Sequence, residues 1–319
     1  MTKEQYISVI IPFHNVEQYI EKCAISLLEQ TYPYIEYVFI NDCSTDSSLI
    51  ILTETINRYP KRKYQVKILS NSENKGTAYT RNLGLSIASG YYIGWVDADD
   101  WIDSNMYEIL LKNMIYHNAD LVWCDYFHEY FDTNHKVSAP LQQENKIQFL
   151  QKYLITSQTF LWNTLAQKDL YKSNKISFCN GCNMWEDYNV STKLHFFARR
   201  SLHIDQALYH YQQTNQKSLC KTISYKSNIS QLENALELYN FFSDKNIFHE
   251  IKRQLLYRVL LAKQFYLYSD KNITNYVSIC PESSRYILSC PFYGFKAKLV
   301  EWLAVKLHSI ILRLADTHI

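Results

Sequence analysis

The 319-residue sequence lacks an excess of charge of either sign, since 33 lysines and arginines stand against 31 aspartates and glutamates, for a net charge of +2. A protein whose main partner is nucleic acid normally carries a strongly basic surface that contacts the phosphates. The charge balance therefore gives no electrostatic support for a nucleic-acid-binding protein.

Long apolar runs are absent too, and none reaches the roughly 20 residues that a membrane-spanning helix needs. Residues 1–5 are polar and lack the basic, apolar and cleavage regions of a signal peptide. We therefore expect a cytoplasmic protein whose eight cysteines are reduced. Cys179 and Cys182 form a single CxxC pair, which without further ligands at suitable spacing favours neither a zinc site nor a thioredoxin-like site.

Internal repeats and low-complexity segments are likewise missing, and the first part of the chain instead alternates between strand and helix patterns. Strands are predicted at 6–12, 35–40, 66–69, 91–96 and 121–126, and helices at 15–30 (with Asn15 as its cap), 45–59, 77–88 and 104–118. This alternation predicts an α/β fold with a mainly parallel sheet covered by helices on both faces.

The pattern changes in the second half of the chain. Short strands are predicted at 127–132 and 208–212, a helix at 186–198, and then helices at 228–242 and 247–268 before a linking segment at 280–291. The break near residue 220 predicts two parts, an α/β domain over 1–222 and a C-terminal helical region over 223–319.

The last predicted helix, 296–314, is strongly amphipathic. Its apolar face carries Leu299, Val300, Leu303, Leu307, Ile310, Ile311 and Leu314, and Lys298, Lys306 and Arg313 lie on the other face. Such a basic amphipathic helix can lie on an anionic membrane surface. Docking of its apolar face onto the preceding helix pair is the alternative, and the sequence favours neither.

Three carboxylates follow the predicted strand 91–96, namely Asp97, Asp99 and Asp100. A strand of an open α/β sheet delivers such side chains to the carboxyl edge, where these sheets bind ligands. Because the three acids repel one another, a hard divalent cation that holds a phosphate is the simplest partner. The alternative is that Asp100 or Asp103 caps the next helix, but a cap needs only one acid.

Four segments fall at the ends of predicted strands on this same edge. They are IIPFHN (10–15), INDCSTD (40–46), NKG with RNLG (74–76 and 81–84) and DADD (97–100). Together they resemble the family 2 glycosyltransferases of the GT-A fold, with motifs of the form IIPxxN, NDGSTD, NxGxxxxRNxG and DxDD. The resemblance is specific over 6–127 and weaker to about 220. Cys43 replaces the usual glycine of the second motif, so that turn must accommodate a side chain.

The resemblance implies a GT-A type, Rossmann-like fold with a nucleotide-sugar half at 1–127 and an acceptor half at 128–222. Asp42 would accept the N3–H of the donor's uracil. Asp99 would bind Mn²⁺ or Mg²⁺, and Asp97 would contact the ribose or a metal-bound water. Further donor-binding candidates are Pro12, Asn15, Lys75, Arg81, Ala98 and Trp185, the last as an apolar wall for a sugar ring. Lys75 is equally explained as a solvated surface charge, and Asp46 as a helix cap.

Trp185-Glu186-Asp187 resembles the family's ED motif, whose second acid is the catalytic base. Asp187 is therefore the expected base, a role worth about 10² to 10⁴ in rate. The alternative is that both acids favour the N-terminus of the next helix through its dipole.

The segment Tyr209-His210-Tyr211 with Ser218 resembles the LYxYxxxxxS segment that often follows in the family. His210 is either a third metal ligand or a structural residue. Many relatives carry a basic residue shortly afterwards, where residues 212–215 here are uncharged.

These features predict an inverting, metal-dependent glycosyltransferase that moves a sugar from a UDP-sugar to a glycan or lipid-linked acceptor in surface polysaccharide assembly. It would lie in the cytoplasm or at the inner face of the plasma membrane, where 296–314 would make a peripheral contact. A nucleotidyltransferase would need a glycine-rich, basic loop after the first strand, and residues 12–15 contain no Gly, Lys or Arg. A degenerate nucleotide-sugar-binding protein is the other alternative, disfavoured by the retained acids Asp42, Asp97, Asp99 and Asp187.

Overall fold

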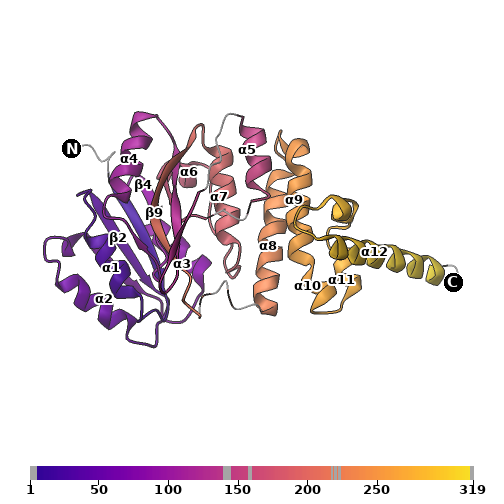
Figure 1. Cartoon of the computed structure of the whole chain (residues 1–319), viewed down its shortest axis with the longest axis horizontal. Coiled ribbons are helices and arrows are strands. Elements are labelled where there is room, and N and C mark those ends of the chain that lie inside the picture. Colours follow the sequence, from indigo (N-terminus) through magenta and orange to yellow (C-terminus); the bar gives the residue numbers. More distant parts are fainter. Residues whose placement is uncertain are drawn as a thin grey trace.

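The computed structural model describes residues 6–138, 145–156, 160–216, 218, 221 and 224–316. Figure 1 shows an α/β part in indigo to magenta, a block of orange helices beside it, and a yellow last helix that projects from that block. In the described residues, no helix combines the length and the apolarity needed to cross a membrane.

The first half of the sheet is parallel, in the order β3-β2-β1-β4. These strands are β1 (Ile7–Phe13), β2 (Ile35–Asn41), β3 (Val66–Ser70) and β4 (Tyr92–Trp95), joined by α1 (Ile20–Leu28), α2 (Ser48–Asn57) and α3 (Thr77–Ile87). Each of these four strands lies within a residue or two of its prediction. For β1, β2 and β4 the reason is that the strands are almost wholly buried and mostly apolar, which makes them visible in the sequence.

The second half of the nine-stranded sheet is mixed. Its strands are β5 (Trp101–Ile102), β6 (Leu121–Glu129), β7 (Asn134–Val137), β8 (Thr164–Gln167) and β9 (Ser201–Gln212). Because β8 is antiparallel to both β4 and β6, and β9 is parallel to β6, the strands β6 and β9 run in the same direction as β1–β4. Only β5, β7 and β8 of the described strands oppose them, so the predicted mainly parallel sheet is confirmed.

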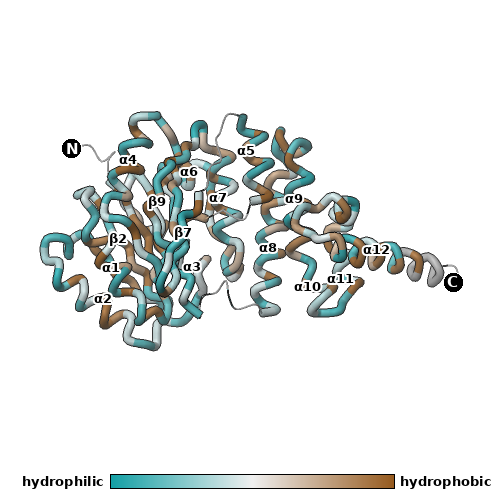
Figure 2. The backbone as a smooth tube through the Cα atoms, viewed as in Figure 1, coloured by the Kyte–Doolittle hydropathy of each residue, from teal (hydrophilic) through white to brown (hydrophobic). Residues whose placement is uncertain are grey.

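Two apolar cores cover the two faces of this sheet. Successive side chains of a strand point to opposite faces, so Val9 and Ile11 join one core whereas Ile10 joins the other. The first core packs under α1, α2 and α4 (Met106–Tyr116), and the second under α3 and α7 (Glu186–Phe197). Helices on both faces were predicted, and Figure 2 shows brown, apolar segments concentrated along the strands between them.

Two helix caps that the sequence suggested are absent from the described structure. Asn15 does not cap α1, which begins only at Ile20; it adopts a φ of 51° instead, and its side-chain oxygen accepts the N–H of Thr45 at 2.8 Å. It therefore ties the end of β1 to the loop after β2. The helix α4 begins at Met106, and no side chain caps it, so neither Asp100 nor Asp103 serves as its cap.

The remaining helices form a block against α7. They are α5 (Lys146–Tyr153), α8 (Tyr225–Phe242), α9 (Phe248–Lys263), α10 (Phe265–Tyr268), α11 (Ile273–Ser278) and α12 (Phe295–Asp316), with a 3₁₀ segment at Pro281–Ser289 where a link was expected. The short α6 (Lys168–Ser173) instead packs in the second core of the sheet. One apolar cluster joins side chains of α5, α7, α8 and α9, among them Phe149, Tyr188, Leu238 and Leu255. The predicted C-terminal helical extension is thus present, and it packs on the α/β part.

Candidate active site

The loop after β4 carries the three acids, and one of them is an internal anchor. Asp100 is 1% exposed and accepts the hydroxyl of Tyr209 at 2.6 Å and the N–H of Gln212 at 2.8 Å. The same Tyr209 oxygen accepts the N–H of Asp97 at 3.2 Å. Burial, followed by the charges of Asp99 and Asp97, raises the pKa of Asp100 well above its usual range. Asp100 therefore fixes the loop against β9.

The other two acids remain as candidate ligands. Burial, and then the charge of Asp97, raises the pKa of Asp99, whose Oδ2 accepts the side-chain amide of Asn215 at 2.8 Å. Within the described residues no three Asp, Glu, His or Cys side chains converge on one point. The pair still fits Mg²⁺ or Mn²⁺, because a cation relieves the repulsion that raises the Asp99 pKa, and these ions keep several water and phosphate ligands.

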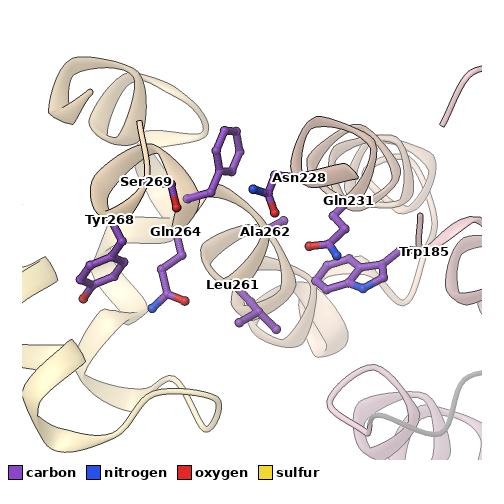
Figure 3. A pocket seen from close by; sticks show the side chains of 9 residues that line it. Trp185, Asn228, Gln231, Leu261, Ala262, Gln264, Tyr268 and Ser269 are labelled. Atoms are coloured by element: carbon purple, nitrogen blue, oxygen red, sulfur yellow. The ribbon is translucent and has the colours of Figure 1, made fainter. Parts of the chain in front are cut away.

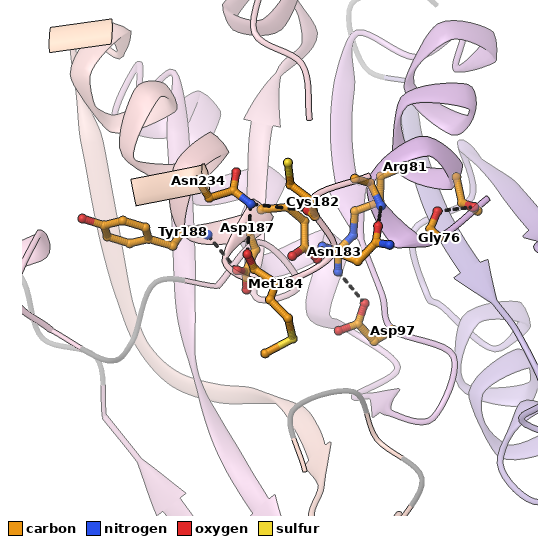
Figure 4. Close-up of polar contacts among 12 residues, drawn as sticks. Gly76, Arg81, Asp97, Cys182, Asn183, Met184, Asp187, Tyr188 and Asn234 are labelled. Carbon is orange, nitrogen blue, oxygen red and sulfur yellow. Dashed lines mark hydrogen bonds and ion pairs between the residues drawn. The ribbon is translucent and has the colours of Figure 1, made fainter. Parts of the chain in front are cut away.

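Arg81 of α3 connects this loop to the predicted base. Its side chain is 5% exposed; Nη2 lies 2.9 Å from Asp97 Oδ1 and Nη1 lies 2.6 Å from Glu186 Oε1. Burial opposes its charge, but the carboxylates of Asp97, Glu186 and Asp187 outweigh burial and raise the Arg81 pKa. Its guanidinium therefore links the two acidic motifs. Figure 4 shows its contact with Asp97.

Asp187 stands in the first turn of α7, two residues after Trp185, which adopts a left-handed φ of 65°. Its Oδ1 accepts the N–H of Tyr188 at 2.7 Å. Burial, and then the charge of Glu186, raises the pKa of Asp187 from 3.8 to about 7, while Arg81 opposes the rise. A carboxylate tuned toward neutral pH suits a general base.

Asp42, at the end of β2, organises the loop between β3 and α3. Its Oδ1 accepts the N–H of Lys75 and the amide of Asn71, and its Oδ2 accepts the N–H of Gly76, each at 2.8 Å. Gly76 has a φ of 84°, and a Cβ there would collide with Asn183, which comes from the loop before α7. The second and third motifs therefore meet at Asp42, beside the segment that leads to Asp187.

The residues of the first two motifs also touch. His14 Nδ1 lies 2.8 Å from the carbonyl oxygen of Asp42, and Asn15 reaches Thr45. Cys43 adopts a φ of 59°, a conformation that favours the glycine usual in this motif, and it does so while remaining partly exposed. The four motifs thus gather at one sheet edge, and the unusual cysteine takes the turn that the glycine would take.

Several other candidates lie around this centre in different settings. Pro12 is part of β1, paired with Ile40 of β2, and Ala98 is buried at 4% exposure in the acidic loop. The ammonium of Lys75 pairs with Glu73, and 38% of the Lys75 side chain is exposed, which fits a surface charge.

Asp46 accepts the N–H groups of Ser48 and Glu17 at 3.0 and 3.1 Å. Its carboxylate therefore binds the first N–H of α2, just before which Ser47 is the N-cap residue, and connects it to the loop before α1.

His210 makes its polar side-chain contacts with Glu129 and Asp103, and not with Asp97 or Asp99. Its Nδ1 is 2.7 Å from Glu129 Oε1 and its Nε2 is 3.0 Å from Asp103 Oδ1. The ring stacks on Trp101 and on Phe127, with centroids 5.1 Å apart in both cases. Both nitrogens are engaged by carboxylates, so this geometry is that of a structural residue that ties β9 to β5 and β6.

Asn215 and Tyr209 are the site residues that sequence reasoning did not assign. Both lie in the segment that resembles LYxYxxxxxS. Nothing in that segment indicated that the Tyr209 hydroxyl would bind Asp100 or that the Asn215 amide would bind Asp99. The missing basic residue at 212–215 was the one available signal, and the structure shows a neutral amide there instead.

A groove of about 330 Å³ opens beside Trp185, between α8, α9 and α10 (Figure 3). It is lined by Trp185, Asn228, Gln231, Leu261, Ala262, Gln264, Phe265, Tyr268 and Ser269. An aromatic wall with several amides provides both apolar contact and hydrogen bonds. Trp185 thus faces a groove of the helical block, two residues before Asp187 in the chain.

Comparison with known proteins agrees with this geometry. The profile described as "Glycosyl transferase family 2" matches residues 8–184. The chain is 30% identical over 260 residues to EpsH of Bacillus subtilis (strain 168), which is named as a glycosyltransferase; the match covers 78% of this chain and 72% of EpsH.

Two solved structures share the fold. Residues 1–349 of S. aureus TarS, in complex with UDP-GlcNAc, superpose with a TM-score of 0.64 at 21% identity, over 89% of this chain and 79% of that one. The mannosyltransferase PcManGT of Pyrobaculum calidifontis, in complex with GDP-Man and Mn²⁺, gives a TM-score of 0.56 at 15% identity, over 94% and 79% of the two chains. The chain belongs to glycosyl transferase family 2, and it is a glycosyltransferase of the GT-A fold that uses a nucleotide-sugar donor.

Proposed function

We propose that this enzyme is an inverting, metal-dependent transferase that moves a sugar from a UDP-sugar to a hydroxyl of a glycan or lipid-linked acceptor during surface polysaccharide assembly in the cytoplasm. The observation that carries the proposal is the chain of contacts from Asp97 through Arg81 to Glu186, which sets a base of raised pKa beside the acidic loop. The UDP-GlcNAc complex of TarS and the Mn²⁺ complex of PcManGT support the donor and the metal by analogy.

Asp99, with Asp97 beside it, would hold Mn²⁺ or Mg²⁺ together with the donor diphosphate. When bound, the ion would neutralise the negative charge that develops on the departing diphosphate. Asp42 would accept the uracil N3–H through Oδ2, because a carboxylate oxygen accepts two hydrogen bonds and Gly76 supplies one of them.

Asp187 would take the proton of the acceptor hydroxyl. As this proton moves to the carboxylate, the acceptor oxygen forms a bond to the anomeric carbon, and the bond from that carbon to the phosphate oxygen breaks with its electron pair on UDP. One displacement from the opposite face inverts the anomeric configuration. Glu186, held by Arg81, would position the start of α7 so that Asp187 faces the donor.

The test is release of UDP from a panel of UDP-sugars, with Mn²⁺ and with EDTA, for the wild type and for Asp99→Asn. We expect slow, metal-dependent hydrolysis of one donor that falls by at least about 10² in the variant, since the removed carboxylate is the expected metal ligand. Asp244→Asn is the matched control, because this acid is 73% exposed and pairs only locally with Lys245.

Equal turnover in EDTA or in Asp99→Asn would contradict the metal assignment. Binding of UDP, measured by calorimetry, without turnover of any donor would instead favour the degenerate nucleotide-sugar-binding protein.

A further inference from the structure

The last helix, α12, docks on the helical block through a narrow polar line. Glu301 is fully buried; its carboxylate accepts the hydroxyl of Tyr276 at 2.6 Å and the side-chain amide of Gln264 at 2.7 Å. Val305 and Ala297 pack beside it against the neighbouring apolar clusters. The side of α12 that faces the protein is therefore small and polar.

The large apolar side chains point the other way. Phe295, Leu299, Val300, Trp302, Leu303, Leu307 and Ile310 are 37 to 81% exposed. At 100° per residue these positions share one side of the helix, opposite Glu301. An amphipathic helix that serves only its own fold buries its apolar stripe. The expectation that this stripe docks on the preceding helices is wrong for the described side chains; those of Ile311, Arg313 and Leu314 lie outside the described part of the structure.

The charge of the exposed side has one sign. Among the described side chains of α12, the charged ones besides Glu301 are Lys296, Lys298 and Lys306. Lys306 Nζ lies 5.7 Å from the centre of the Trp302 ring. Since Glu301 is buried, the outer side presents lysines and apolar groups without an exposed acid among those side chains.

We propose that α12 lies in the plane of an anionic phospholipid membrane, with its apolar side in the acyl boundary and its lysines at the headgroups. Charge complementarity selects this occupant over a second copy of the chain, because a self-complementary interface would bring the lysines of two copies together. An in-plane helix gains from buried apolar area and from attraction to anionic lipids, and tryptophan favours the interface. In Figure 2 this projecting helix shows brown turns on the surface of the molecule.

The docked side of α12, which carries Glu301, lies next to the groove beside Trp185. Gln264, which donates to Glu301, lines that groove, as does Tyr268. With α12 attached to a membrane, the groove would therefore lie behind the helix, on the side opposite the lipid surface.

The experiment is co-flotation of the full chain with vesicles of phosphatidylcholine alone or with about 30 mol % phosphatidylglycerol, at low salt and at about 0.5 M NaCl. We expect binding to the anionic vesicles that salt weakens, and at least about tenfold weaker binding for Leu303→Glu/Leu307→Glu. Leu288→Glu is the matched control, because Leu288 is 58% exposed but lies outside α12. Since all three side chains are exposed, thermal unfolding should be unchanged and verifies folding.

Absent flotation of the wild type, or equal flotation of the α12 variant and the control, would overturn the proposal. A concentration-dependent dimer, seen by light scattering and lost only in the α12 variant, would also overturn it by identifying a second copy as the occupant.

Discussion

Replacing Asp187 with Asn should remove activity and stabilise the fold at the same time. The pKa of Asp187 is raised from 3.8 to about 7, chiefly because burial disfavours its charge. With about 1.36 kcal/mol for each pKa unit, the full rise corresponds to about 4 kcal/mol. Because Glu186 shares this electrostatic effect, we expect Asp187→Asn to increase the free energy of unfolding at pH 8 by about 1–3 kcal/mol.

The sign of the pH dependence follows from the direction of the shift. A carboxyl with a raised pKa in the folded state binds more protons than in the unfolded state between about pH 4 and 7. Its contribution to stability is therefore present below its unfolded pKa and is lost as the pH rises through its folded pKa. The gain in stability of Asp187→Asn over the wild type should be largest at pH 8 and should vanish near pH 4.

The assays are denaturant unfolding at several pH values and sugar transfer by the same preparations. We expect kcat/KM to fall by about 10² to 10⁴ in Asp187→Asn, and the wild-type rate to fall below about pH 7 as the base becomes protonated. Asp244→Asn should match the wild type in both assays. Full activity in Asp187→Asn, or a loss of stability at pH 8 as large as at pH 5, would refute the assignment of a base with a raised pKa.

Three further changes test the surroundings of the site. Arg81→Met should cost about 3–5 kcal/mol of stability by leaving the buried carboxylate of Glu186 unpaired, and denaturant unfolding should show a smaller loss for Arg81→Lys. Tyr209→Phe should cost about 1–3 kcal/mol because Asp100 loses a buried hydrogen bond, and calorimetry should show weaker Mn²⁺ binding if the loop shifts Asp99. His210→Ala should lower Tm without changing the Mn²⁺ concentration for half-maximal activity; a large change there would support metal ligation instead.

Much of the fold could be predicted because the central strands are buried and therefore appear in the sequence as short, mostly apolar runs. Most residues of β1, β2 and β4 are apolar, interrupted by Ser8 in β1 and by Glu36 and Asn41 in β2, so the type and approximate ends of these strands were visible. The strands β5 and β8 are two and four residues long and form only by pairing with distant partners, which leaves no local pattern. The division of the chain at 222/223 stays a prediction.

The site was predictable only where a motif marks it. Asp97, Asp99 and Asp187 came from strand-end position and family resemblance, and their proposed roles stay predictions, as do those of Pro12, Lys75 and Ala98. The contacts of Tyr209 with Asp100 and of Asn215 with Asp99 join residues 109 and 116 positions apart. No spacing rule encodes such pairs, since they depend on how β9 returns across the sheet edge.

The ion pairs of Arg81 have a consequence for recombination. The residue belongs to the predicted nucleotide-sugar half of the chain, 1–127, whereas Glu186 belongs to the predicted acceptor half, 128–222. A chimera that keeps 1–127 and takes its acceptor half from a relative must import an acid at position 186, or it buries an arginine with half its partners. Acceptor specificity can therefore be exchanged in this way only with relatives whose acceptor half keeps a carboxylate at this position.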